Sequence, residues 1–245
     1  MRQRLDQEMV SRGLVTSRAR ARDLIRRGFV HIAGVKATKP AQSVLPEAAI
    51  KIEGEGQNYV SRGALKLAAA IKEFAFDLED RICVDVGAST GGFTQVLLEA
   101  GAGKVYAVDV GHDQFADALR SDPRVVVIER TDARKLTQAE IPDSVEAIVS
   151  DVSFISLAKA LPAVMALATP DCVLVALIKP QFEVGPERVG KGGIVRDEAA
   201  IQNACQDVQS WLEKQIGWTV LGVVPSPITG GSGNREFLIG ARFDG

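Results

Sequence analysis

The segment Val84-Asp85-Val86-Gly87-Ala88-Ser89-Thr90-Gly91-Gly92-Phe93 joins an apolar run to the first turn of a helical pattern. Glycines between a strand and a helix allow the backbone to approach a ligand closely at the carboxyl end of the strand. The spacing is not G-x-G-x-x-G, and the turn lacks the lysine of a P-loop. The segment therefore predicts a ligand-binding turn that follows the first strand of an α/β sheet without matching either common phosphate-binding motif.

Apolar runs and helical stretches alternate along the chain from residue 61 onward. Continuous apolar runs are typical of strands buried on both faces, and their alternation with helices is typical of a mostly parallel sheet. We therefore predict the α/β class, with a Rossmann-like, doubly wound sheet of seven strands. The strands are expected at 82–86, 104–108, 124–128, 147–150, 173–178, 219–224 and 236–242. The helices are expected at 62–74, with Ser61 as N-cap, and at 93–100, 113–119, 157–167 and 197–215.

Acidic residues follow the next two strands of this pattern. Asp109 ends the second strand, 22 positions after Gly87, where an acid can bind ribose hydroxyls, and Asp132 follows the third strand, where an adenine amino group can be recognised. With Asp85 and the glycine turn, the pattern resembles the S-adenosylmethionine site of class I methyltransferases. An NAD-type Rossmann domain with an atypical turn is the alternative. The resemblance implies S-adenosyl-L-methionine as cofactor, bound by Asp85, Gly87, Ser89, Thr90, Gly91, Gly92, Phe93, Asp109, Val110, Asp132 and Ala133.

The first 40 residues are strongly basic, although the whole chain has a net charge of −2. They hold ten Lys and Arg side chains and three acids, a charge of +7 that leaves −9 for the rest of the chain. Eight of the ten are arginines, whose planar guanidinium suits bidentate phosphate contacts. This asymmetry indicates a polyanion-binding module, with a solvated helix face as the alternative.

The basic segment has the pattern of a small α+β domain. A first helix is expected from Leu5 to near Gly13, and a second over 18–27 between Ser17 and Gly28, followed by short strands at 29–32, 35–37 and 50–52. The segments Ser17-Arg18-Ala19-Arg20-Ala21-Arg22-Asp23-Leu24-Ile25 and Gly28-Phe29-Val30-His31-Ile32-Ala33-Gly34-Val35 resemble the S4 RNA-binding domain. The resemblance implies RNA contacts by Arg4, Arg18, Arg20, Arg22, Arg26, Arg27 and Lys36. The polar, glycine-rich stretch near 53–58 predicts an S4-like domain at 1–55, a linker at 56–60 and a second domain at 61–245.

Four charged residues interrupt or end apolar elements of the second domain: Lys66, Asp151, Lys179 and Glu236. Lys66 lies inside the helix over 62–74, whereas Asp151 and Lys179 end the fourth and fifth strands. Because the carboxyl ends of parallel strands form the ligand crevice of such sheets, Asp151 and Lys179 are expected to share a pocket. Any one of the four alone is more simply a snorkelling lysine or a helix-capping acid. Their combination indicates a catalytic site.

This set resembles the K-D-K-E tetrad of FtsJ/RrmJ-type ribose 2′-O-methyltransferases. Together with the S4-like domain, the whole chain is similar to the TlyA (haemolysin A) family of rRNA methyltransferases, whereas the joining segment 57–60 departs from the family pattern. The resemblance implies S-adenosylmethionine-dependent methylation of ribosomal RNA on a ribose 2′-hydroxyl, at cytidine. It rests on Val60-Ser61-Arg62-Gly63-Ala64-Leu65-Lys66-Leu67, Asp151-Val152-Ser153-Phe154-Ile155-Ser156, Ile178-Lys179-Pro180-Gln181-Phe182-Glu183 and Gly190-Lys191-Gly192-Gly193-Ile194-Val195-Arg196-Asp197.

The residue types suit this chemistry. A ribose 2′-hydroxyl must lose its proton as it attacks a methyl group. Burial and a second ammonium nearby both disfavour a charged lysine, so Lys66 is expected to favour the neutral form of Lys179. Asp151 and Glu236 oppose this effect, but they can orient the lysines and the incoming hydroxyl. We therefore expect Lys179 to act as general base, with Lys66, Asp151 and Glu236 positioning it, and we expect no metal.

Composition narrows the class of protein further. The longest apolar run, residues 172–178, has seven residues, far short of the roughly 18 that a membrane-spanning helix needs. The first residues lack the apolar core of a signal peptide, and the three cysteines support neither a disulfide framework nor a zinc cluster. We expect a cytoplasmic protein whose partner is ribosomal RNA or a ribosomal subunit, with no membrane contact. A non-catalytic RNA-binding protein and, less favoured, a haemolysin are the alternatives, and the oligomeric state is left open.

Overall fold

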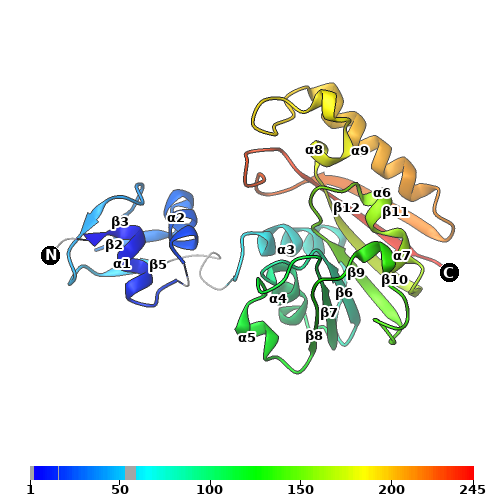
Figure 1. Cartoon of the computed structure of the whole chain (residues 1–245), viewed down its shortest axis with the longest axis horizontal. Helices are drawn as coiled ribbons and strands as arrows, with labels where there is room; N and C mark the ends of the chain where they lie inside the picture. Colours follow the sequence, from blue (N-terminus) through cyan, green and yellow to red (C-terminus); the bar gives the residue numbers. More distant parts are fainter. Residues whose placement is uncertain (1–2, 16, 53–58) are drawn as a thin grey trace. The chain divides into compact units, whose positions relative to one another are not determined.

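The chain forms two compact units, Met1–Ser61 and Arg62–Gly245, drawn in blue and in cyan to red in Figure 1. A computed structural model describes residues 3–15, 17–52 and 59–245, apart from the side chains of Asp23 and Arg27. Residues 56–58 of the predicted linker lie outside the described residues.

The smaller unit packs two helices and short antiparallel strands around one core. Helices α1 (Leu5–Ser11) and α2 (Arg18–Arg27) contribute to that core with β2 (Val30–Ile32), the central strand of a sheet ordered β3-β2-β5. The other strands of the unit are β3 (Val35–Lys36), β5 (Ile50–Ile52) and an antiparallel pair formed by β1 (Gln3–Arg4) and β4 (Ser43–Val44). The sequence did not predict the two-residue strands β1 and β4, which form a pair apart from the sheet β3-β2-β5.

Helix α2 has the predicted boundaries, and its caps explain why. The Ser17 hydroxyl accepts a hydrogen bond from the Arg20 backbone N–H at 3.2 Å. Gly28 ends the helix with φ of 77°, a left-handed conformation that favours glycine. Ala21, Leu24 and Ile25 are buried, so the helix turns its apolar stripe inward and leaves Arg18, Arg22 and Arg26 exposed.

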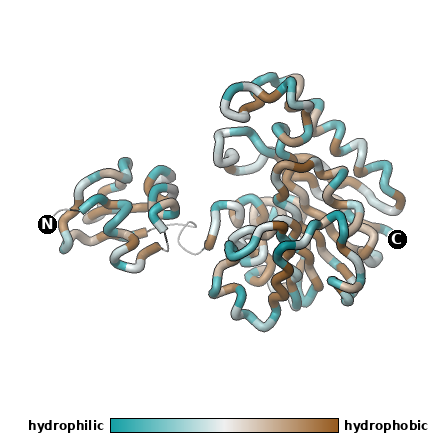
Figure 2. The backbone as a smooth tube through the Cα atoms, in the orientation of Figure 1, coloured by the Kyte–Doolittle hydropathy of each residue, from teal (hydrophilic) through white to brown (hydrophobic). Residues whose placement is uncertain are grey.

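A seven-stranded sheet forms the centre of the larger unit, as predicted, in the order β11-β12-β10-β9-β6-β7-β8. Five neighbouring strands pair in parallel, and β12 runs antiparallel to both β10 and β11, so β11 has the same direction as those five. Figure 2 shows hydrophobic residues concentrated along these strands. The strands are β6 (Ile82–Val86), β7 (Lys104–Val108), β8 (Val125–Ile128), β9 (Val145–Ser150), β10 (Ala168–Ile178), β11 (Trp218–Pro225) and β12 (Phe237–Phe243).

Helices cover both faces of the sheet. On one face, Val84 and Val86 of β6 pack in the cluster that includes Leu157 and Leu212. On the other face α3 lies so close that a Cβ on Gly240 would meet the Phe74 ring at 2.6 Å. The helices are α3 (Gly63–Phe74), α4 (Gly92–Glu99), α5 (Asp117–Arg120), α6 (Leu157–Ala160), α7 (Pro162–Met165), α8 (Pro180–Glu183) and α9 (Glu198–Glu213), with 3₁₀ turns η1 (Ala133–Lys135) and η2 (Pro186–Arg188).

Three helix predictions were wrong in detail. Arg62, not Ser61, precedes α3, and no side chain caps it. The helix predicted over 113–119 is the single turn α5, because Asp113 has a φ of 56° and lies outside helical geometry. The helix predicted over 157–167 is divided into α6 and α7 at Pro162, which has no backbone N–H to continue the first helix. No helix of the described residues is long and apolar enough to cross a membrane.

Replacement of Ser17 by alanine should loosen α2, because the Arg20 N–H loses its acceptor, at a cost of about 1 kcal/mol. Hydrogen exchange of the α2 amides should therefore become about fivefold faster. Ser43→Ala is the matched control, because Ser43 is exposed on β4 and makes no side-chain hydrogen bond within the described part of the chain. Equal exchange rates in α2 for both variants would contradict the cap.

Candidate functional site

The four charged residues singled out in the sequence converge at one edge of the larger sheet. Asp151 directly follows β9 and Lys179 directly follows β10. Because β12 is antiparallel to β10, with Phe237 opposite Ile178, Glu236 lies at the same edge as Lys179. Lys66 reaches this edge from the first turn of α3.

The side chains form a continuous chain of ion pairs. Glu236 Oε2 lies 2.6 Å from Lys66 Nζ, which is 3.8 Å from Asp151 Oδ2. The other oxygen of Asp151, Oδ1, lies 2.7 Å from Lys179 Nζ. Lys179 also donates a hydrogen bond to the hydroxyl of Ser153 at 2.8 Å.

This network is nearly removed from water. The side chains of Lys66, Lys179 and Glu236 are 9%, 10% and 3% exposed, and that of Asp151 is 21% exposed. Two cations and two carboxylates balance in charge, which buried ions require. Asp151 is the most accessible member and the one that bridges both lysines, so a substrate hydroxyl can approach the pair Asp151–Lys179.

A cavity of about 730 Å³ adjoins Asp151 at the carboxyl ends of the parallel strands. Its size suits a small-molecule cofactor. Asp151 lines it together with six of the residues predicted to bind the cofactor: Gly87, Ser89, Asp109, Val110, Asp132 and Ala133. The other five, Asp85, Thr90, Gly91, Gly92 and Phe93, are not among the lining residues, and Gly92 and Phe93 are buried at the start of α4.

The glycine turn connects the cavity to the ion pairs. The backbone N–H of Asp151 donates to the carbonyl of Val86 at 3.1 Å. Gly87 has a φ of 86°, and a Cβ there would lie 3.1 Å from the carbonyl carbon and oxygen of Asp151. Glycine at this position therefore allows the turn and Asp151 to pack directly on each other.

Two of the acids that line the cavity, Asp109 and Asp132, are held in different ways. Asp109 accepts hydrogen bonds from the backbone N–H groups of Ser89 and Gly111, both at 2.7 Å, which fixes its carboxylate against the glycine turn. Asp132 caps the turn η1 and pairs with Arg134 at 2.6 Å. The hydrogen bond from the Arg134 side chain lowers the pKa of Asp132 to about 2, so this carboxylate is ionised at neutral pH.

Asp85 lies behind the cavity rather than in it. Its side chain is fully buried, and its Oδ2 accepts a hydrogen bond of 2.7 Å from the Thr94 hydroxyl of α4. Its other oxygen has no hydrogen-bond partner among the described residues. Burial raises the pKa of Asp85 to about 7, and the nearby carboxylates of Asp151 and Asp109 act in the same direction.

The segment 179–183 contacts the loop after Asp151 at three positions. Besides the bond from Lys179 to Ser153, the rings of Phe182 and Phe154 lie 5.0 Å apart, and Glu183 accepts a 2.9 Å hydrogen bond from the Leu157 N–H. Phe154 is 90% exposed and has a φ of 65°, a strained conformation for a bulky residue. The loop therefore holds an aromatic ring in solvent at the mouth of the cavity.

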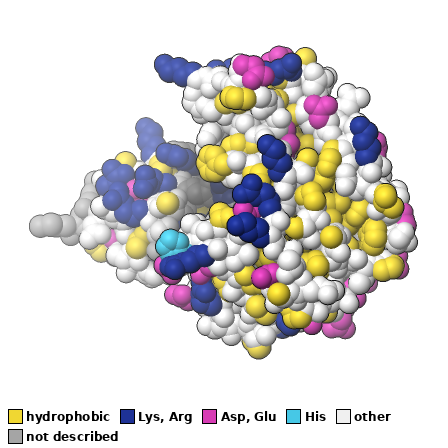
Figure 3. All heavy atoms as spheres, turned by 45° about the vertical axis from the view of Figure 1, so that its right-hand side comes forward, with side chains coloured by type: hydrophobic (Ala, Val, Ile, Leu, Met, Phe, Trp, Pro, Cys, Tyr) yellow, Lys and Arg dark blue, Asp and Glu magenta, His cyan; other side chains and the backbone are white. Residues whose placement is uncertain are grey.

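The predicted RNA-binding residues lie on the smaller unit, where Figure 3 shows a cluster of Lys and Arg side chains. Arg4 is in β1, Lys36 is in β3, and Arg18, Arg20, Arg22 and Arg26 are in α2. The side chain of Arg27 lies outside the described part of the chain. Arg12, in contrast, turns to the carbonyls of Leu45, Pro46 and Ala48 and so serves the fold.

The comparison with known proteins matches both units. The sequence pattern of the FtsJ-like methyltransferases matches residues 59–243, and that of the S4 domain matches residues 3–50. The chain is 47% identical over 242 residues to the 16S/23S rRNA (cytidine-2'-O)-methyltransferase TlyA of Mycobacterium tuberculosis, covering 98% of this chain and 90% of the relative. The chain belongs to the TlyA group of the FtsJ-like methyltransferase family.

Two further TlyA-group relatives agree with this assignment. Hemolysin A of Brachyspira hyodysenteriae is 42% identical over 240 residues, covering 96% of this chain and 98% of the relative. A solved structure named as a hemolysin, from Streptococcus thermophilus, superposes with a TM-score of 0.76 at 38% identity, covering 99% of this chain and 88% of the other. The hemolysin name thus occurs among proteins that share both units with TlyA.

The sequence did not single out five residues that shape this FtsJ-like site: Thr94, Ser153, Phe154, Phe182 and Glu183. Four of them stand within four positions of Asp151 or Lys179, in the segments that carry the family resemblance, but nothing in those segments assigned them a role in the site. Which of them would face the cavity depends on the local path of two loops, which hydrophobic periodicity does not describe.

The raised pKa of Asp85 predicts a pH-dependent stability for the methyltransferase unit. Between pH 4 and 7 the folded state holds a proton on Asp85 that the unfolded state has lost, so this contribution to stability falls as the pH rises through that window. Asp85→Asn mimics the protonated side chain and keeps an acceptor for Thr94. Its stability relative to the parent protein, measured by urea unfolding, should therefore increase from pH 5 to pH 8. Parallel curves across this range would show that Asp85 ionises normally.

Proposed function

We propose that the protein transfers a methyl group from S-adenosyl-L-methionine to a ribose 2′-hydroxyl of ribosomal RNA, at cytidine. The observation that carries this proposal is the chain Glu236–Lys66–Asp151–Lys179, which adjoins a cofactor-sized cavity through Asp151. The TlyA relative named above carries this activity in its name and is similar along nearly the whole chain.

The lining of the cavity fits S-adenosylmethionine. Asp109, fixed by two backbone N–H groups, offers carboxylate oxygen for ribose hydroxyls, and Asp132 offers an acceptor for the adenine amino group. Gly87 lines the cavity beside Asp151, and we place the amino-acid end of the cofactor there. When bound, S-adenosylmethionine supplies an electrophilic methyl group on a positively charged sulfur.

In this proposal Lys179 is the general base. Its Nζ takes the proton of the ribose hydroxyl as the oxygen forms a bond to the methyl carbon and the carbon–sulfur bond breaks. Asp151 orients Lys179 at 2.7 Å, whereas Lys66 is held by Glu236 at 2.6 Å and places a second positive charge in the network.

The surroundings suggest how RNA is presented. The exposed ring of Phe154, backed by Phe182, offers a flat surface on which a base of a single-stranded or extruded nucleotide can stack. The S4-like unit, which we place at residues 1–55, adds arginines for backbone phosphates. We also propose a cytoplasmic location, in keeping with ribosomal RNA as the substrate.

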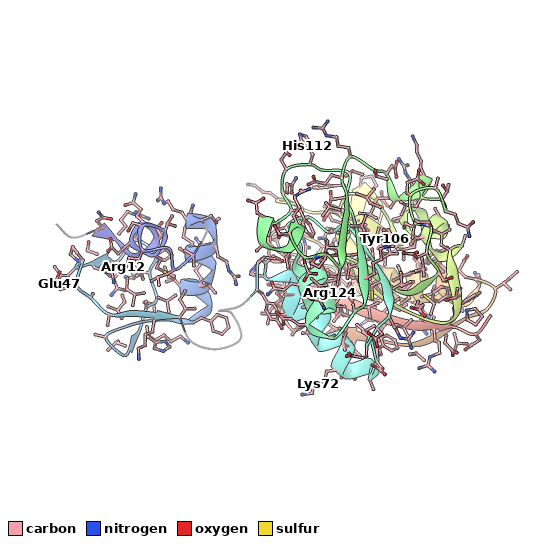
Figure 4. The ribbon with its side chains drawn as sticks, turned by 90° about the horizontal axis from the view of Figure 1, so that it is seen from below. Arg12, Glu47, Lys72, Tyr106, His112 and Arg124 are labelled. Carbon is pink, nitrogen blue, oxygen red and sulfur yellow. The ribbon has the colours of Figure 1, made fainter. Side chains whose placement is uncertain are left out.

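The decisive experiment is transfer of labelled methyl groups from S-adenosylmethionine to naked rRNA, isolated ribosomal subunits and whole ribosomes. Lys179→Ala and Lys179→Arg should both lower kcat by about 10²- to 10⁴-fold, since arginine keeps the charge but does not lose its proton. Lys72→Ala is the control, because Lys72 lies on the same helix as Lys66 but points away from the site (Figure 4). Cofactor affinity, measured by calorimetry, should be similar in all four proteins.

Each outcome discriminates between functions. Label on a ribose with the parent protein and Lys72→Ala alone supports methyl transfer with Lys179 as base. Full activity of Lys179→Arg would mean that the site needs a cation and not a base. Binding of subunits and cofactor without any transfer would favour a non-catalytic RNA-binding protein.

Glu183 separates a positioning effect from a charge effect. Glu183→Ala leaves the Leu157 N–H without its acceptor and frees the loop that holds Ser153 and Phe154, so methyl transfer should fall about tenfold. Glu183→Gln retains an acceptor oxygen and should stay within about twofold of the parent protein. Equal losses in the two variants would indicate that the negative charge, and not the hydrogen bond, is needed.

A further inference from the structure

A buried carboxylate lies under the arginines of the smaller unit. Asp6, in the first turn of α1, is 0% exposed. Arg4 contacts both of its oxygens, with Nε at 3.0 Å from Oδ1 and Nη2 at 3.1 Å from Oδ2. Arg18 and Arg22 approach Oδ2 at 3.3 and 3.9 Å.

These three arginines remain open to solvent although they share one buried partner. Their side chains are 45%, 48% and 46% exposed. A guanidinium has five N–H donors, and Arg4, for example, uses two of its groups on Asp6. Three cations around one anion leave a local charge of +2 with donors to spare, which suits a phosphate backbone.

The neighbouring acid on the same helix behaves differently. Glu8 pairs with Arg12 at 2.7 Å, and the other guanidinium nitrogens of Arg12 donate hydrogen bonds to three backbone carbonyls. That pair ties α1 to the 45–48 segment. The side chain of Asp6, in contrast, pairs with Arg4 of β1 and with Arg18 and Arg22 of α2. All three are predicted RNA-binding residues, so these ion pairs fix the positions of the arginines themselves.

Fixed arginines bind with less loss of conformational freedom than mobile ones. Each long side chain that is ordered in advance is worth about two- to tenfold in affinity. Three guanidiniums this close also repel one another, and the Asp6 carboxylate offsets that repulsion. Arg4 and Arg18 hold the pKa of Asp6 below its usual value, so the carboxylate stays ionised at neutral pH.

We infer that Asp6 is a positioning residue for RNA binding, which holds Arg4, Arg18 and Arg22 as a preformed phosphate-binding cluster. This inference rests on the proposed function of the smaller unit. It makes a prediction of unusual sign: removal of an acid from a basic surface should weaken RNA binding. If charge alone mattered, the same change would strengthen binding, because it raises the positive charge of the unit.

The test compares two variants that each remove one negative charge, Asp6→Asn and Glu47→Gln, in the full chain. Glu47 is exposed on the smaller unit, where its side chain points outward (Figure 4). For purified ribosomal subunits, Asp6→Asn should raise Kd about tenfold, whereas Glu47→Gln should leave Kd equal or lower. In methyl transfer, Asp6→Asn should raise KM for subunits and leave kcat within about twofold, a split that loss of folded protein would not produce.

A second pair keeps the inference testable if Asp6→Asn does not fold. Arg4→Lys preserves charge but cannot make the two-point contact with Asp6, so Kd should rise more than for Arg26→Lys, whose side chain makes no contact with Asp6. Equal effects of the two lysine variants, or tighter binding by Asp6→Asn, would overturn the role of Asp6. Failure of the parent protein to bind subunits would instead overturn the proposed function.

Discussion

Burial of two lysines at one edge of the larger sheet is the constraint on which the site depends. An ammonium taken out of water needs a carboxylate at contact distance, and Lys66 and Lys179 have Glu236 and Asp151 at 2.6 and 2.7 Å. Those distances require the ends of β9, β10 and β12 and the first turn of α3 to lie close together. The antiparallel pairing of β12 with β10 brings Glu236 beside Lys179, and Gly240 lets α3 come close enough to deliver Lys66.

The same edge joins the ion pairs to the cavity. Gly87 and Asp151 pack backbone to backbone, so a displacement of the glycine turn is transmitted to the carboxylate that bridges both lysines. Behind the turn, Asp85 ties β6 to α4 through Thr94 and removes one more carboxyl group from the cavity. The proposed cofactor site and the proposed base are thus parts of one packed unit rather than neighbours connected by a mobile loop.

Much of this arrangement could be predicted from the sequence, for identifiable reasons. Strands buried on both faces give long apolar runs, and a charged residue that ends such a run stands out, as Asp151 and Lys179 do. The sheet rule then places those two together. Features that leave no periodic pattern in the sequence were not predicted. They are the exposed Phe154 with its positive φ, the hydrogen bond from the Leu157 N–H to Glu183, and the position of Asp85 behind the cavity. Pro162 divided a helix whose apolar pattern continued across it.

In each unit one carboxylate pairs with several cationic side chains, which are buried in the larger unit and about half exposed in the smaller one. Asp151 holds two lysines whose side chains are about one-tenth exposed, so these opposite charges compensate one another away from water. Asp6 holds three arginines whose side chains stay nearly half exposed, so they remain accessible from solvent. In the net charge of the first 40 residues, Asp6 counts only as one negative charge that lowers the total. Its position under the guanidiniums makes it a determinant of where the remaining charge lies, which sequence charge alone cannot express.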